Sequence, residues 1–148
     1  MRMNICRAVV AVVLGCGVPA AASAGELVVI VNAANPAAGM DAKQVKAHFL
    51  KTAAAWENGE KVRPVDVSGS SPDRTAFLAK VLGMSAAELE RYWIERQYAN
   101  ADNPPSKVAD DAAVIKLVSA FKGGLGFVSK ASLPANQDQI KALLTISY

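Results

Sequence analysis

Hydrophobic residues along the chain alternate between runs typical of strands and spacings typical of helices. Residues 26–32 carry a continuous apolar run, which predicts a strand buried on both faces and therefore central in a covered sheet. Residues 61–67 alternate apolar and polar positions, and Pro64 indicates an edge or a bend in that strand. Two further short strands are predicted over 126–128 and 140–146.

Helical spacing and capping signals separate these strands. Four helices are predicted, over residues 41–50, 72–82, 85–98 and 110–121. Asp41 with Gln44, and Ser85 with Glu88, have the spacing of capping boxes at two helix starts. Residues 99–107 are polar and rich in proline, which predicts a loop. Strands that alternate with helices predict an α/β domain with a mixed, mainly parallel sheet.

The first 24 residues have the features of a secretory signal peptide. A basic start precedes an apolar run over 8–15, and an Ala-Ser-Ala cleavage signal ends at Ala24. The run is shorter than the roughly 20 residues that span a membrane. We therefore expect a periplasmic protein, with a mature chain of residues 25–148 that has no transmembrane segment. A lipoprotein box ending at Cys16 is the less well matched alternative.

Without the leader, the composition excludes several classes of function. The full chain has 16 Lys and Arg and 13 Asp and Glu, and two of the arginines lie in the leader. The mature chain is thus close to neutral and has no basic footprint for nucleic acid. Both cysteines also lie in the leader, so thiol chemistry is excluded. We see no nucleotide or nucleophile motif, and we expect neither an enzyme nor a cofactor.

A few polar and aromatic residues that could form a site are better explained by a structural role. His48 is the only histidine, which leaves a metal site or a relay without partners and predicts a partly solvated surface residue. Asp110-Asp111 is expected to begin a helix rather than to hold a metal. Core packing is expected of Trp56, Trp93 and Tyr92, rather than stacking on a sugar or a partner.

The stretch from Asp66 to Arg74 carries the candidate chemistry. It joins a predicted strand to a predicted helix through Ser68, Gly69, Ser70 and Ser71, and Pro72 would occupy the first helical position. The first N–H groups of a helix lack internal partners and carry partial positive charge, so such a turn can bind an anion, most commonly phosphate. Ser71 and Pro72 are equally an ordinary N-cap and first-turn pair.

The order of several segments resembles the phosphate-binding component of bacterial phosphate ABC transporters. The matching pieces are 27–32, 49–51, 64–66, 71–77, 81–83, 92–93, 104–105, 111–114 and 123–128. They cover nearly the whole mature chain, and the last is similar to a "PGAIGYV" segment of that family. The resemblance implies a type II periplasmic binding-protein fold, here a single three-layer lobe with helices on both sides of the sheet.

The resemblance also implies a binding site. Asp66 matches the family's aspartate, and Ser68-Gly69-Ser70 matches its Ser-Gly-Thr turn. Pro64 stands where the family has an arginine, and Arg74 is expected to substitute for it or to pair with an aspartate instead. We expect the ligand contacts to come from Asp66, Ser68, Gly69, Ser70, Ser71 and Arg74.

Two functions follow from these residues. The first is a periplasmic module that binds an oxyanion, with phosphate expected over sulfate because Asp66 would accept a hydrogen bond from a protonated oxygen. A single lobe leaves the ligand open to water, so a second copy or another envelope protein is expected to close the site. The alternative is a non-catalytic interaction protein that kept the lobe fold and docks on a transporter, a sensor or an outer-membrane protein.

Overall fold

The computed structural model describes residues 25–148, and the predicted leader lies outside them. A five-stranded sheet forms the centre, in the order β3-β2-β4-β1-β5. Its strands are β1 (Glu26–Asn32), β2 (Arg63–Val67), β3 (Ser106–Val108), β4 (Gly124–Ser129) and β5 (Ile140–Ser147). β2 runs parallel to β3 and β4, whereas β1 runs antiparallel to β4 and β5. The α/β class and the mixed sheet are confirmed. The expectation that the sheet is mainly parallel was wrong, because only the β3-β2-β4 half has parallel pairing.

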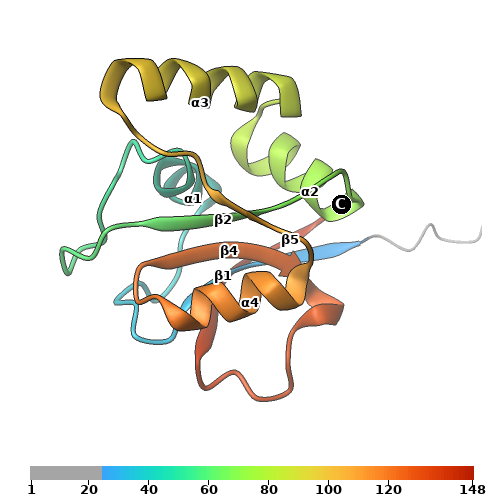
Figure 1. Cartoon of the computed structure of the whole chain (residues 1–148). Helices are drawn as coiled ribbons and strands as arrows, with labels where there is room; N and C mark the ends of the chain where they lie inside the picture. Colours follow the sequence, from blue (N-terminus) through green and yellow to red (C-terminus); the bar gives the residue numbers. More distant parts are fainter. Residues whose placement is uncertain (1–24) are drawn as a thin grey trace, which may run out of the picture.

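Helices cover both faces of this sheet (Figure 1). They are α1 (Ala42–Phe49), α2 (Pro72–Phe77), α3 (Ala86–Asn100) and α4 (Asp111–Ala120). α4 covers one face, α1 and α2 cover the other, and α3 lies outside α1. The chain therefore has three layers, as the resemblance implied.

The predicted helix starts are present, and one predicted helix changes character. Asp41 and Ser85 each form the expected capping box with the residue three positions later. The helix predicted over 72–82 is α-helical only to Phe77 and continues as a π-helical turn (η1, Leu78–Leu82). Gly83 then ends it at a φ of 65°, in the left-handed region that glycine tolerates.

The core forms on both faces of β1 and β4. Phe77 and Phe127 stack with their ring centroids 4.1 Å apart, and Phe49 packs edge-on against Phe77 at 4.9 Å. On the α4 face, a Cβ at Gly126 would lie 2.6 Å from Val114 Cγ1, so glycine permits the close approach of helix and strand. Both tryptophans are buried, as the sequence predicted.

The segment predicted as a loop over 99–107 was assigned wrongly in part. Its last two residues, with Val108, form the edge strand β3, which pairs with β2 from Val65 onward. Pro64, which has no N–H, precedes this pairing, so the β3 side of β2 has no partner there. The predicted edge was wrong for the strand as a whole, because β2 lies between β3 and β4. Strand β4 begins at Gly124, two residues before its predicted start.

No helix among residues 25–148 is long and apolar enough to cross a membrane. Within the same residues, no group of three or more His, Cys, Asp or Glu side chains is arranged to hold a metal ion.

Candidate functional site

The turn between β2 and α2 is built as the sequence predicted locally. Ser71 is the N-cap of α2, and its Oγ accepts a hydrogen bond from the backbone N of Arg74 at 3.1 Å. Pro72 occupies the first helical position. Gly69 has a φ of 80°, in the left-handed region, so glycine lets the turn reverse there without strain. A Cβ at this position would meet no atom within 4 Å.

The backbone of this turn leaves donors free. The N–H of Ser68 donates to the carbonyl oxygen of Val108 at 2.7 Å, which ties the start of the turn to β3 and removes that donor from ligand binding. Within residues 25–148, the N–H groups of Gly69, Ser70 and Ser71 make no hydrogen bond. Three consecutive N–H groups on an exposed turn are suitable donors for an oxyanion.

Arg74 and Asp66 form a buried ion pair beneath the turn. Arg74 Nε lies 3.0 Å from Asp66 Oδ1, and Arg74 Nη2 lies 2.9 Å from Asp66 Oδ2. Oδ1 also accepts from the backbone N of Val67 at 2.8 Å. The hydrogen bonds that Arg74 donates to Asp66 raise the pKa of Arg74. Asp66 is only 2% exposed, so the pair is fixed inside the fold, and Arg74 Nη1 is the part of the guanidinium outside it.

Five of the six residues expected to contact the ligand open onto three different depressions, and Gly69 lines none of them. Asp66 and Arg74 line a pocket of about 330 Å³ beside α3, here called the α3 pocket. Ser68 and Ser71 line a hollow beside the start of α4. Ser70, again with Ser71, lines a hollow along α2 that also holds Lys80 and Tyr148. The turn thus separates the serine hydroxyls from the guanidinium instead of gathering all six groups around one cavity.

The hollow beside α4 is acidic. Asp73, Asp110 and Asp111 line it together with Ser68 and Ser71. Each carboxylate has a structural partner: Asp110 accepts from Ala113 N at 2.9 Å, Asp111 accepts from Ser129 N at 3.0 Å, and Asp73 accepts from Tyr148 Oη. The bond to Asp73 raises the pKa of Tyr148 to about 12. Asp110 is the N-cap of α4, as predicted. Three carboxylates on this side repel an anion that approaches the turn from α4.

Comparison with known proteins finds likeness in structure and not in sequence. No family model and no curated protein matches the chain. A structure assigned to the phosphate ABC transporter substrate-binding proteins, from Clostridium perfringens and with bound phosphate, matches with a TM-score of 0.64 and 18% identity over 81% of this chain. An ABC-type phosphate transport receptor from Vibrio cholerae matches with a TM-score of 0.62 and 21% identity over 81% of this chain.

The chain has a periplasmic binding-protein fold. It spans less than half of the two solved proteins, 44% of the first and 46% of the second. At these identities the likeness establishes the fold alone. The resemblance expected from the order of sequence segments is therefore confirmed for the fold, and the ligand has to be argued from the residues of this chain.

Within this binding-protein fold, the sequence did not indicate the groups that complete the α3 pocket. Lys107 lies beside Asp66 because β3 pairs with β2 in that register. Trp93 also lines the pocket, and its buried indole Nε1 has no hydrogen-bond partner within residues 25–148. No sequence signal places Lys107 there, since β3 is only three residues long and carries no strand pattern.

Proposed function

We propose that this protein is a non-catalytic, substrate-binding-like module of the periplasm that binds an oxyanion, with phosphate as the first candidate. The contacts in this proposal are the N–H groups of Gly69, Ser70 and Ser71, which make no hydrogen bond within residues 25–148, and the hydroxyl of Ser70, because Ser68 opens onto a different hollow. The observation that carries it is the row of three unpaired N–H groups at a helix start. The fold shared with two phosphate-transport proteins supports it.

In this proposal Asp66 and Arg74 act as a unit. Both oxygens of Asp66 already accept hydrogen bonds, so the carboxylate orients Arg74. Because Asp66 neutralises the charge of Arg74, the guanidinium contributes to the ligand through Nη1. Asp66 contributes selectivity for a protonated oxyanion where the ion pair opens.

Calorimetric titration of the purified protein with phosphate, with sulfate as the control, tests the proposal. In a site open to water, each hydrogen bond contributes about 1 kcal/mol to the free energy of binding, so we expect millimolar affinity for the chain alone. Ser70→Ala should weaken phosphate binding about fivefold, since it removes one hydroxyl. Ser106→Ala, at an exposed serine on β3, is the matched control and should bind as the parent does. Equal affinities for the two variants would contradict the assignment of Ser70.

Tighter binding requires a second wall that carries positive charge, because Asp73, Asp110 and Asp111 lie beside the turn. We propose that a second copy or an envelope protein supplies it. Sedimentation of the protein with and without phosphate tests the first case, and phosphate-dependent association is the expected result.

N-terminal sequencing of the exported protein tests the location, with Gly25 expected as the first residue.

A second function is favoured by the acidic hollow and by the engagement of Arg74 with Asp66. In this alternative the lobe is an interaction protein that docks on a transporter, a sensor or an outer-membrane protein. Crosslinking in intact cells, followed by purification, should then recover one partner at near-equal amounts. Recovery of no such partner, together with saturable phosphate binding, would reject this alternative.

A further inference from the structure

A second polar pocket lies at the opposite end of β2, where the strand begins. It has a volume of about 290 Å³, and Lys51, Lys61 and Arg63 line it; we call it the basic pocket. Its other lining residues are apolar or uncharged, among them Pro64, Leu117 and Phe121. None of the three cations forms an ion pair with a carboxylate of residues 25–148. The pocket therefore gathers positive charge that the described part of the chain does not neutralise.

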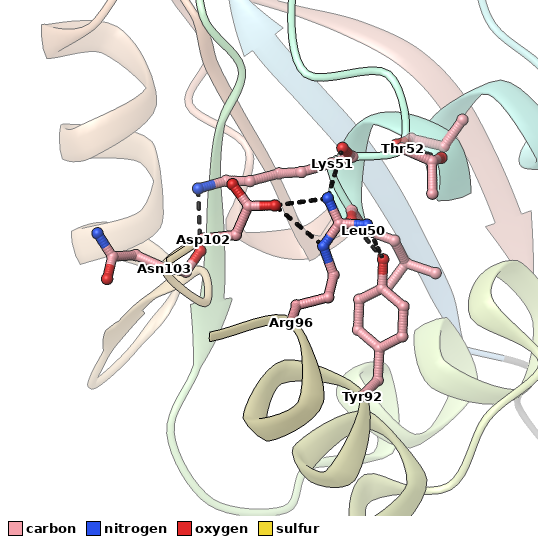
Figure 2. Close-up of polar contacts among 8 residues, drawn as sticks. Leu50, Lys51, Thr52, Tyr92, Arg96, Asp102 and Asn103 are labelled. Carbon is pink, nitrogen blue, oxygen red and sulfur yellow. Dashed lines mark hydrogen bonds and ion pairs between the residues drawn. The ribbon is translucent and has the colours of Figure 1, made fainter. Parts of the chain in front are cut away.

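Hydrogen bonds hold Lys51 in place at both its backbone and its side chain (Figure 2). Its φ of 56° lies in the left-handed region, which is uncommon for a residue with a Cβ. Arg96 Nη2 donates to the carbonyl oxygen of Lys51 at 3.3 Å, and Lys51 Nζ donates to the carbonyl oxygen of Asn103 at 2.9 Å. Burial lowers the pKa of Lys51, and the charges of Arg96 and Arg63 act in the same direction, against that of Asp102.

The nearby carboxylate does not cancel this charge. Asp102 Oδ2 accepts from Arg96 at both Nη2 and Nε, at 2.5 and 3.1 Å. Its charge is thereby matched by Arg96, and Lys51 stays as an additional cation. Figure 2 shows Asp102 turned toward Arg96, with the ammonium of Lys51 at Asn103.

Arg63 is also oriented before any ligand arrives. Its guanidinium carbon lies 4.6 Å from the centroid of the Phe121 ring, a cation–π arrangement. Phe121 is 41% exposed, so the ring and the guanidinium together form an open wall. Groups that are already ordered lose little conformational entropy on binding, which favours affinity.

We propose that the basic pocket binds a small organic polyanion, such as a di- or tricarboxylate, at a site separate from the serine turn. Several carboxylates on one ligand match three cations that have no acidic partner among residues 25–148. The apolar walls from Pro64, Leu117 and Phe121 accommodate the carbon skeleton, which inorganic phosphate lacks. The site lies at the start of β2, whereas the serine turn follows its end, so the two sites can be tested independently.

An amide-resolved NMR titration with citrate, on protein expressed from the 148-residue chain, tests this proposal. Citrate should give saturable shifts at the amides of residues 61–63, 65, 103, 106 and 121–123. Lys61→Ala with Arg63→Ala should weaken citrate binding by at least about tenfold. The matched control is Lys43→Ala with Lys116→Ala, which removes the same charge at two exposed lysines outside the pocket and should change the affinity less than about twofold.

Three results would overturn the proposal. The first is that both double variants weaken citrate binding equally. The second is that citrate shifts only the amide signals of residues 68–74. The third is that no amide signal shows a saturable shift up to about 10 mM citrate. If the alanine pair fails to fold, Lys61→Met with Arg63→Met retains most of the side-chain length without the charge, and the same loss is required of it. Ser70→Ala should leave citrate binding unchanged, which distinguishes failure of this site from failure of the phosphate site.

Discussion

Replacing Arg74 by alanine should destabilise the fold strongly, although the residue lies in the first turn of an exposed helix start. The side chains of Arg74 and Asp66 are 11% and 3% exposed, and two short hydrogen bonds join them. Removal of one partner from a buried ion pair leaves an uncompensated charge and costs about 3–5 kcal/mol. Because water reaches part of Arg74, we expect the lower end, about 3 kcal/mol.

Urea unfolding followed by tryptophan fluorescence measures this loss, since Trp56 and Trp93 are both buried and report on the core. A double-mutant cycle with Asp66→Asn and Arg74→Met isolates the pair. The double variant should be less destabilised than the sum of the two single variants, because it leaves neither charge unpaired. Arg91→Ala, at an exposed position on α3, provides the control and should stay within about 0.5 kcal/mol of the parent.

A loss below about 1 kcal/mol for Arg74→Ala would refute this reasoning, because the pair would then behave as a surface salt bridge. That result would also change the view of the site. Arg74 could leave Asp66 at little cost and reach the serine turn with its whole guanidinium. A loss near 3 kcal/mol means that the phosphate site must work with Arg74 held in place.

Three further perturbations test other parts of the fold. Ser71→Ala removes the N-cap of α2 and should cost about 1 kcal/mol in the same urea assay; no change would mean that water replaces the cap. Gly126→Ala places a Cβ 2.6 Å from Val114 Cγ1 and should cost about 1–3 kcal/mol, whereas Gly39→Ala, in open space, should not. Burial lowers the pKa of His48, so the unfolded chain binds the proton more readily than the folded chain does. Thermal stability should therefore fall as the pH drops through about 6.5. His48→Gln should make the stability less dependent on pH in that range.

The sequence predicted the elements whose signals are local. The apolar run of β1 is the clearest case, because a strand covered on both faces needs no polar alternation. Capping at Asp41 and Ser85 was equally predictable, since each box closes within one turn. Strand β3 was not, because three residues carry no periodicity and pair only once β2 is in place.

The candidate site was predictable as a turn and not as a cavity. Nothing in the spacing of Ser68 and Ser70 reveals that they open on different sides of the chain. The sequence predicted, as one of two alternatives, that Arg74 pairs with an aspartate, and in the structure it forms an ion pair with Asp66. The acidic hollow depends on α4 packing beside the turn, a long-range contact that local patterns do not encode. Sequence reasoning therefore identified the donors and missed the charges around them.

The distribution of charge about β2 constrains what can complete the serine turn. At the end of the strand, three N–H groups make no hydrogen bond within residues 25–148 and are available to an anion, but Asp73, Asp110 and Asp111 line a hollow beside them. At its start, Lys51, Lys61 and Arg63 have no acidic partner among the described residues. A second wall at the serine turn must therefore bring cations, since one with further carboxylates would raise the repulsion that a phosphate dianion already meets. Phosphate binding by the protein with such a partner should consequently weaken more with added salt than binding by the chain alone.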